Sequence, residues 1–164
     1  MDKEFSERLL TLIERDSRLT HEELARALNC SVSVVDECVQ QLEDDQIICG
    51  YHTLINWDKV HSDAVTALVE LRVTPQGRYG YNQIAEHIYQ YPQVETLYLM
   101  SGAYDFLVVL REKNIKDVSL FVSENLASME EVQGTTTYFT LIKYKENGFL
   151  FTTPKNDKRM VVTP

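Results

Sequence analysis

The spacing of apolar residues predicts three short helices near the start of the chain. Apolar side chains recur every three or four positions in residues 4–16, 24–28 and 31–45, with charged residues between them. This periodicity is typical of helices that bury one face. A few residues join the second helix to the third, as in a helix-turn-helix. Residues 47–55 are rich in β-forming side chains around one glycine, and we expect them to form a wing or a pair of short strands.

Polar residues at the ends of these segments support the same helices. Thr20 and Glu23 have the spacing of a capping box at the start of the second helix. Asn29 suits the left-handed conformation that ends this helix. Ser31 or Ser33 is expected to cap the third helix through its hydroxyl group.

A different pattern begins after a connecting stretch. Apolar and polar side chains alternate along residues 65–73, which predicts a strand with one buried face. The sequence then predicts a helix, two strands, a helix and a strand, at 81–89, 97–100, 106–110, 115–126 and 135–144. The order β-α-β-β-α-β is that of a ferredoxin-like domain, in which four antiparallel strands carry both helices on one face. Residues 148–151 are expected to add an edge strand.

These patterns predict an α+β protein with an N-terminal winged helix-turn-helix and a C-terminal ferredoxin-like domain. The expected limits are a first domain at 1–55, a linker at 56–63, a second domain at 64–153 and a mobile polar tail at 154–164.

The strand at 106–110 is apolar at every position, so both of its faces are expected to be covered. A helix can cover one face, and we expect a second copy of the chain to cover the other in a dimer. The turn at 101–105 joins this strand to the one before it. Gly102 is expected to supply backbone freedom there, and Asp105 to accept hydrogen bonds from neighbouring backbone N–H groups.

Composition narrows the class of protein. The chain has 164 residues and a net charge of −9, which argues against non-specific affinity for nucleic acid. The charged N-terminus is unlike a signal peptide and no apolar run has the length of a membrane span, so we expect a cytoplasmic protein without a membrane partner. Cys30, Cys38 and Cys49 are odd in number and widely spaced, which favours reduced thiols. The cysteines and histidines lack metal-ligand spacing, and neither a metal nor a cofactor is expected.

Three short motifs are more specific than the periodic pattern. Residues 42–51 contain Leu-Glu, Ile-Ile and Gly-Tyr pairs, residues 101–106 read Ser-Gly-Ala-Tyr-Asp-Phe, and residues 135–138 read Thr-Thr-Thr-Tyr. With the order of elements, these motifs resemble the leucine-responsive regulator/asparagine-regulator (Lrp/AsnC) family of transcription factors, from about residue 9 to about residue 144. The resemblance implies an N-terminal domain that binds double-stranded DNA. It also implies a RAM-type ferredoxin-like domain that binds an amino acid or related metabolite, in a homo-oligomer built from dimers.

The resemblance also implies where the effector would bind. The residues at the matching positions of this chain are Met100, Ser101, Gly102, Ala103, Tyr104, Asp105, Thr135 and Thr137. A zwitterionic amino acid needs acceptors for its ammonium group and donors for its carboxylate. Asp105 or turn carbonyls suit the first role, and turn N–H groups or threonine hydroxyls suit the second. The same residue types also suit an ordinary hairpin turn and a half-exposed strand, so the residues alone leave both interpretations open.

The charge of the expected recognition helix departs from the family. Residues 1–60 contain 6 basic and 13 acidic residues, and residues 31–45 contain no Lys or Arg. The family commonly has Arg where this chain has Cys38, Gln40 and Gln41. Because phosphate neutralisation supplies much of the affinity for DNA, we expect weak, salt-sensitive binding. The expected DNA-binding residues are Arg18, Arg26, Ser31, Ser33, Glu37, Gln40 and Gln41.

The sequence leaves one alternative function open and disfavours another. A family relative with weak or lost DNA binding would sense a metabolite or act through mixed oligomers with a more basic relative, and the acidic third helix favours this interpretation. An enzyme is disfavoured, because no Ser-His-Asp set, carboxylate pair or phosphate-binding loop accompanies Tyr104 and Asp105.

Overall fold

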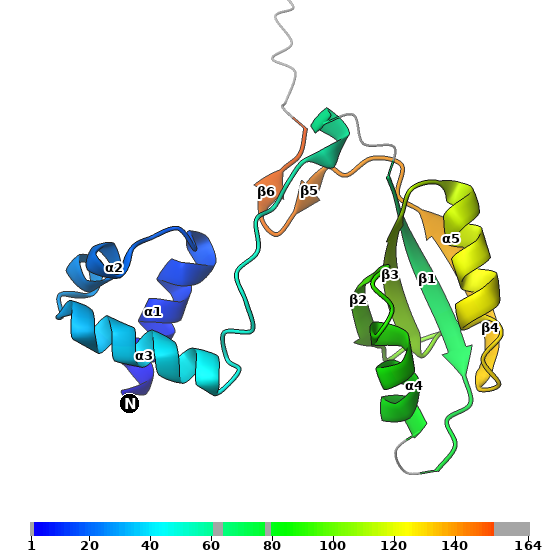
Figure 1. Ribbon diagram of the computed structural model, residues 1–164, viewed down its shortest axis with the longest axis horizontal. Helices are drawn as coiled ribbons and strands as arrows, with labels where there is room; N and C mark the ends of the chain where they lie inside the picture. The colour runs from blue at the N-terminus through cyan, green and yellow to red at the C-terminus, as the bar shows by residue number, and fades with distance from the viewer. Residues whose placement is uncertain (1, 61–63, 78–79, 153–164) are drawn as a thin grey trace, which may run out of the picture. The chain divides into compact units, whose positions relative to one another are not determined.

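A computed structural model describes residues 2–60, 64–77 and 80–152 of the chain (Figure 1). The chain divides into two compact units, residues 1–55 and 56–164, and each has its own hydrophobic core. Across the described ranges, no helix combines the length and apolar character needed to cross a bilayer. The expected tail at 154–164 lies outside the described residues.

Three helices form the N-terminal unit, as the apolar periodicity predicts. They are α1 (Lys3–Arg15), α2 (His21–Leu28) and α3 (Val32–Asp44). Their apolar stripes face one another and bury Leu9, Leu24, Ala25, Leu28, Val35, Cys38, Val39 and Leu42. Cys38 therefore belongs to this core, whereas Cys30 is half-buried and Cys49 is exposed.

The expected caps of α2 are confirmed. The Thr20 hydroxyl accepts from the Glu23 N–H at 3.3 Å, and the Glu23 carboxylate accepts from the Thr20 N–H at 2.9 Å. Asn29 has a φ of 56°, in the left-handed region. Ser31 occupies the N-cap position of α3, but its side chain makes no capping hydrogen bond. Its hydroxyl instead lies 2.9 Å from that of Ser33.

The segment after α3 does not form the expected pair of strands. Residues 45–56 contain no β-strand. The chain turns back at Gln46, which has a left-handed φ of 55°. The N–H groups of Ile47 and Ile48 then both donate to the Leu42 carbonyl, at 2.9 and 3.0 Å. These bonds hold the segment against the end of α3, so its β-forming side chains do not pair as strands.

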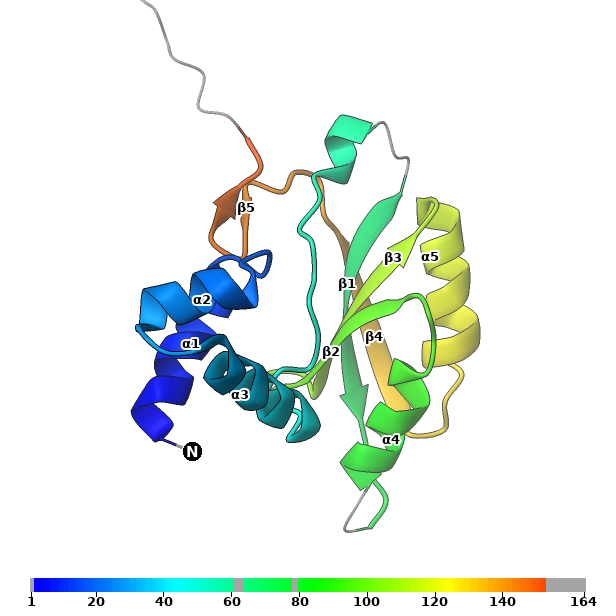
Figure 2. The same ribbon diagram turned by 60° about the vertical axis from the view of Figure 1, so that its left-hand side comes forward.

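The C-terminal unit contains a four-stranded antiparallel sheet with the order β2-β3-β1-β4. The strands are β1 (Val65–Val73), β2 (Val94–Leu99), β3 (Phe106–Glu112) and β4 (Val132–Phe139). The helices α4 (Gly80–Tyr89) and α5 (Ile115–Phe121) lie on one face of the sheet (Figure 2). A π-helical turn, η2 (Val122–Leu126), continues α5. The ferredoxin-like arrangement is confirmed.

Alternating side chains give this sheet a buried face and an open one. The buried residues of β1 and β3, which face the helices, are Ala67, Val69, Leu71, Val73, Phe106, Val108 and Leu110. On the open face Leu107 and Val109 are half-buried, and Tyr98 and Tyr138 remain 54% and 50% exposed. A short 3-10 helix, η1 (Trp57–Val60), lies within the expected linker and places Trp57 against the Arg111 guanidinium, 4.8 Å from the ring centre.

The last part of the chain differs from the prediction. The strand predicted for 135–144 ends at Phe139, opposite Ala67 of β1. Beyond it, Leu141 and Ile142 are exposed, because the chain leaves the sheet after the Thr140 N–H donates to the Thr66 carbonyl at 2.9 Å. The expected edge strand at 148–151 instead forms a separate hairpin, in which β5 (Lys145–Glu146) pairs with β6 (Phe149–Leu150).

Candidate functional site

The exposed face of α3 lies opposite its buried stripe. Ser33, Glu37, Gln40 and Asp44 share this face, because residues spaced by three or four lie above one another on a helix. Gln41 is also exposed. The Gln40 amide donates to the Asp44 carboxylate at 3.0 Å. Gln40, whose amide is suited to hydrogen-bond a base edge, is therefore already bonded to the acidic side chain of Asp44.

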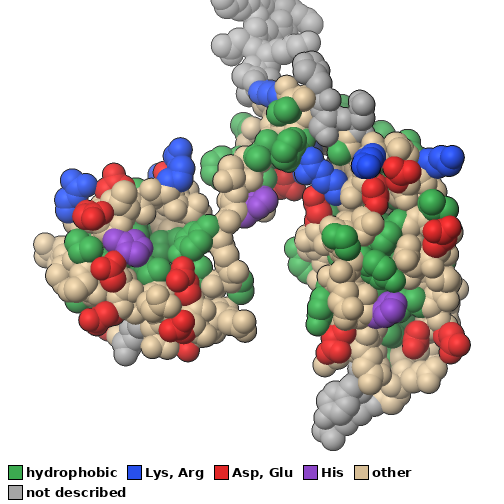
Figure 3. All heavy atoms as spheres, in the orientation of Figure 1, with side chains coloured by type: hydrophobic (Ala, Val, Ile, Leu, Met, Phe, Trp, Pro, Cys, Tyr) green, Lys and Arg blue, Asp and Glu red, His purple; other side chains and the backbone are tan. Residues whose placement is uncertain are grey.

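Acidic side chains also flank this face. Asp36 contacts the His21 imidazole at the start of α2, and Glu43 accepts from the Tyr51 hydroxyl at 2.9 Å. Partial burial raises the pKa of Tyr51, and the hydrogen bond to Glu43 raises it further. Figure 3 shows acidic side chains spread over the visible face of the N-terminal unit, with basic side chains near its edge. The expected recognition surface thus has a negative charge.

The two arginines predicted to contact DNA differ in their partners. Arg18 donates to both oxygens of Asp16, at 3.0 and 3.1 Å, and its side chain is 88% exposed. This guanidinium holds the pKa of Asp16 below its usual range. Arg26 donates from Nε to the Glu22 carbonyl at 3.3 Å and forms no ion pair within the described residues. Arg26 is consequently the more available of the two cations.

The turn between β2 and β3 is held through Asp105. One carboxylate oxygen accepts from the Val73 N–H of β1 at 2.9 Å, and the other from the Tyr81 hydroxyl of α4 at 3.2 Å. Partial burial raises the pKa of the Tyr81 hydroxyl, and the bond to Asp105 raises it further. Asp105 does bond a backbone N–H, as expected, but on a neighbouring strand rather than within its own turn.

The rest of the turn is open. Met100, Ser101, Gly102 and Ala103 are exposed, and Tyr104 is half-buried. The Met100 N–H donates to the Asp105 carbonyl at 2.7 Å, whereas the N–H groups of residues 101–104 have no acceptor among the described residues. Gly102 does not adopt a left-handed φ, so the expected use of its backbone freedom is wrong.

The two predicted threonines lie at different distances from this turn. Thr135 pairs with Leu71 and Thr137 with Val69, so both half-buried side chains lie on the helix-covered face. Leu71 also pairs with Phe106, the first residue of β3. Thr135 is therefore level with the end of the turn but separated from it by β1, and Thr137 lies two residues further along.

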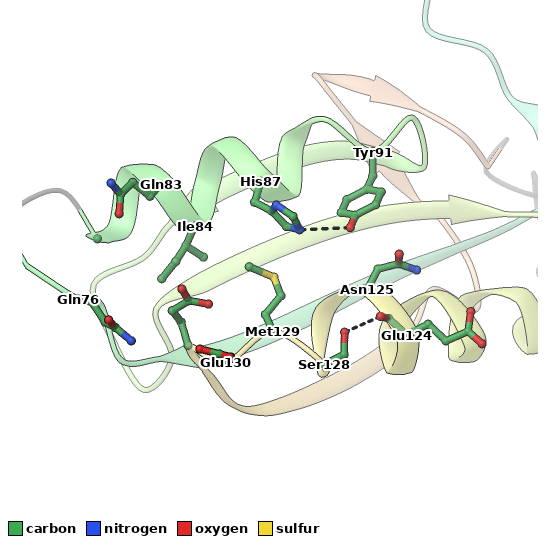
Figure 4. A pocket seen from close by; sticks show the side chains of 12 residues that line it. Gln76, Gln83, Ile84, His87, Tyr91, Glu124, Asn125, Ser128, Met129 and Glu130 are labelled. Carbon is green, nitrogen blue, oxygen red and sulfur yellow. Dashed lines mark hydrogen bonds between the residues drawn. The ribbon is translucent and has the colours of Figure 1, made fainter.

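A groove that the sequence did not reveal opens between α4 and η2. Its volume is about 440 Å³. Figure 4 shows residues of α4 along one side and residues of η2 and the following turn along the other. Six of the lining residues are Gln83, Ile84, His87, Glu124, Met129 and Glu130. No sequence pattern points to this groove, because its sides are separated by about forty residues of chain.

Comparisons with known proteins agree with this architecture. Residues 66–150 match the Lrp/AsnC ligand binding domain, and residues 3–48 match a winged helix-turn-helix DNA-binding domain. The chain is 40% identical over 157 residues to the HTH-type transcriptional regulator YugG of Bacillus subtilis, with 95% of each chain covered.

Two solved structures share the fold. A transcriptional regulator of Neisseria meningitidis in complex with L-Met has a TM-score of 0.70 and 24% identity, covering 89% of this chain and 93% of its own. The leucine response regulatory protein LrpA of Mycobacterium tuberculosis has a TM-score of 0.75 and 20% identity, covering 93% of this chain and 100% of its own. The matched proteins are regulators rather than enzymes, as the sequence indicated. The chain belongs to the Lrp/AsnC family of HTH-type transcriptional regulators.

Proposed function

We propose that this regulator acts as a homo-oligomer, binds double-stranded DNA weakly and in a salt-sensitive manner, and responds to an amino acid or related metabolite. The observation that carries the DNA part of the proposal is the acidic exposed face of α3, with Glu37 and Asp44 and without Lys or Arg. Phosphate neutralisation supplies most of the non-specific free energy of DNA binding, and carboxylates near phosphates oppose it.

Several groups remain to contact DNA. Ser33 and Gln41 are exposed on α3 and can hydrogen-bond base edges. The first N–H groups of α3 can bind a phosphate. Arg18 and Arg26 supply positive charge, and an oligomer multiplies weak contacts through avidity. These features support binding that is measurable at low salt.

Exchanging Arg26 for Glu is expected to abolish DNA binding at moderate salt, because it removes a phosphate contact and adds a repulsive charge. Fluorescence-anisotropy titration of labelled duplex DNA measures this change. Lys113→Glu is a matched control, since it changes an exposed residue of the C-terminal unit by the same charge. Unchanged affinity in Arg26→Glu would show that this face of α2 does not meet phosphate.

The effector part of the proposal rests on the turn at residues 100–105. The unbonded N–H groups of residues 101–104 are suitable donors for a ligand carboxylate. Because internal hydrogen bonds engage both oxygens of Asp105, the ammonium group is better assigned to turn carbonyls than to this carboxylate alone. The L-Met complex of the similar regulator from Neisseria meningitidis favours an amino acid as the ligand class.

The open face of the sheet supports the oligomer. On this face Leu107 and Val109 are half-buried, and Tyr98 and Tyr138 are exposed, so the described residues of the chain leave part of an apolar and aromatic surface in contact with water. A second copy of the chain would remove this surface from water. Analytical ultracentrifugation at micromolar concentration is expected to show a dimer or larger species, and a monomer would contradict the proposal.

A second candidate function is a family member that has lost DNA binding and acts through mixed oligomers with a more basic relative. The hydrogen bond from Gln40 to Asp44 favours it, because it occupies an amide suited to reading adenine. The absence of DNA binding at low salt, together with co-purification of a basic relative, would favour this function over the first.

A further inference from the structure

We propose that the groove between α4 and η2 is a second small-molecule site, separate from the turn at 100–105, which binds a ligand with a protonated amine beside an apolar body. This inference goes beyond the effector site proposed above and does not depend on it. It rests on the shape of the groove, its charge and the helical irregularity that forms one of its sides.

The shape suits a small molecule. A volume of about 440 Å³ lies within the range of ligand pockets. Ile84, Tyr91 and Met129 give the groove an apolar part, and the Tyr91 ring packs against Phe121 in a T-shaped contact with the ring centres 5.2 Å apart. The start of α4 is fixed as well: a Cβ atom on Gly80 would lie 2.7 Å from Pro75 Cβ. The groove is therefore bounded by packed elements.

The charge of the groove selects the ligand class. Glu124, Glu130 and Glu131 line it, and no Lys or Arg does so among the residues that the structure describes. Within the same residues, these three carboxylates have no side-chain hydrogen bond or ion pair. Unpaired carboxylates beside an apolar surface favour a cationic donor such as an ammonium group, and they disfavour an anionic ligand.

His87 does not reverse this preference. Its Nε2 atom lies 3.4 Å from the Tyr91 hydroxyl, so the ring is already engaged on the groove side shown in Figure 4. The amides of Gln76 and Gln83 are neutral and make no hydrogen bonds within the described residues, which leaves them available to a polar ligand group.

The π-helical turn η2 forms part of the acidic side of the groove, because Glu124 lies within it. The Ala127 N–H donates to the Val122 carbonyl five residues earlier, at 2.8 Å. Glu124 within this turn lines the groove, and so do Ser128 and Met129, which follow it in the chain. Single π-turns within helices occur frequently at functional sites. Here the turn follows α5 and forms one side of the groove.

The site can be tested on the full chain by isothermal titration calorimetry. The probes are primary alkylamines of three to six carbons and the carboxylates of matching length. The proposal predicts saturable binding of at least one amine, about tenfold tighter than its matched carboxylate, as expected for one favourable charge interaction. The absence of saturable amine binding, or equal affinity for amine and carboxylate, would overturn it.

Two double variants locate the binding. Glu130→Gln/Glu131→Gln is expected to weaken amine binding about tenfold or more, because it removes two carboxylates from the groove. Glu86→Gln/Glu112→Gln changes the net charge equally at residues that do not line the groove, and it is expected to change amine affinity less than about twofold. Equal losses in both variants would show non-specific attraction and overturn the site. Circular dichroism checks that each variant is folded.

Competition separates this site from the turn. An amine bound in the groove is expected to remain bound when an amino-acid effector saturates the turn, whereas displacement by an amino acid that itself binds the chain would show one shared site and overturn the proposal. Failure of every amino acid to bind, with amine binding intact, would count against the proposed effector site alone.

Discussion

Neutralising the exposed acidic face of α3 is expected to tighten binding to random-sequence duplex DNA by about tenfold or more at low salt. The variant is Glu37→Gln/Asp44→Asn. Both side chains are exposed on the face that contains Ser33 and Gln40. Their removal takes four carboxylates per dimer away from the phosphate backbone, and the Asp44 change also leaves the Gln40 amide without a carboxylate partner.

Anisotropy titration of the variant and the original chain under the same salt conditions measures this effect. The Glu86→Gln/Glu112→Gln protein is again the matched control, since it has the same net charge but leaves α3 unchanged. An equal gain in the control would mean that overall charge, and not this helix, limits the affinity. No gain in either protein would show that the α3 face does not meet DNA.

Truncating Phe106 to Ala is expected to lower the free energy of unfolding of the C-terminal unit by about 3–5 kcal/mol. Phe106 is 2% exposed and pairs with Leu71 and Leu99 at the start of β3. Its ring also meets Tyr81 of α4 edge-on, with the ring centres 6.0 Å apart. The substitution leaves a cavity beneath α4 and beside the Asp105 turn.

Urea denaturation followed by tryptophan fluorescence measures this loss. Trp57 is the only tryptophan in the sequence, and it packs on Arg111 of β3, so its emission reports on the C-terminal unit. Phe149→Ala is the matched control because Phe149 is 60% exposed, and it is expected to change the unfolding free energy by less than about 0.5 kcal/mol. Similar losses in the two variants would contradict the assigned core.

Local sequence predicted the elements whose structure depends on neighbouring residues. The capping box at Thr20 and Glu23, the left-handed Asn29 and the buried stripe of α3 follow from spacing within a few positions. The strand β1 follows from alternation in the same way. In these elements the spacing of apolar residues and the residues at the ends of each element favour the same conformation.

The features that the sequence did not predict depend on distant partners. Residues 140–144 have strand-forming side chains but leave the sheet after Phe139, which no local pattern indicates. The sequence correctly predicted that Asp105 accepts a hydrogen bond from a backbone N–H group. Its partners, Val73 and Tyr81, lie on a strand and a helix that only the fold brings beside it. The groove combines α4 with η2, so its acidic lining is invisible in the linear sequence.

The exposed face of α3 has acidic side chains and no Lys or Arg. The chain matches the family in both of its domains, and the proposed DNA-contacting face of α3 has Glu37 and Asp44 where cations would favour phosphate binding. If each chain binds DNA weakly, the fraction of DNA that is bound depends strongly on how many chains the oligomer contains. Anything that alters the assembly of the oligomer then alters DNA binding. An effector that changes the oligomer would then change transcription without altering any contact between α3 and DNA.

The most direct test of this account is the salt dependence of DNA binding by the unmodified protein. Anisotropy would be measured for random-sequence duplex DNA and for the DNA upstream of the protein's own gene. With about four phosphate contacts per dimer, the affinity is expected to fall about a hundredfold between roughly 50 and 200 mM salt, with tighter binding to the upstream DNA. Tight binding that persists at the higher salt, or no binding at the lower salt, would contradict the proposed weak, salt-sensitive regulator.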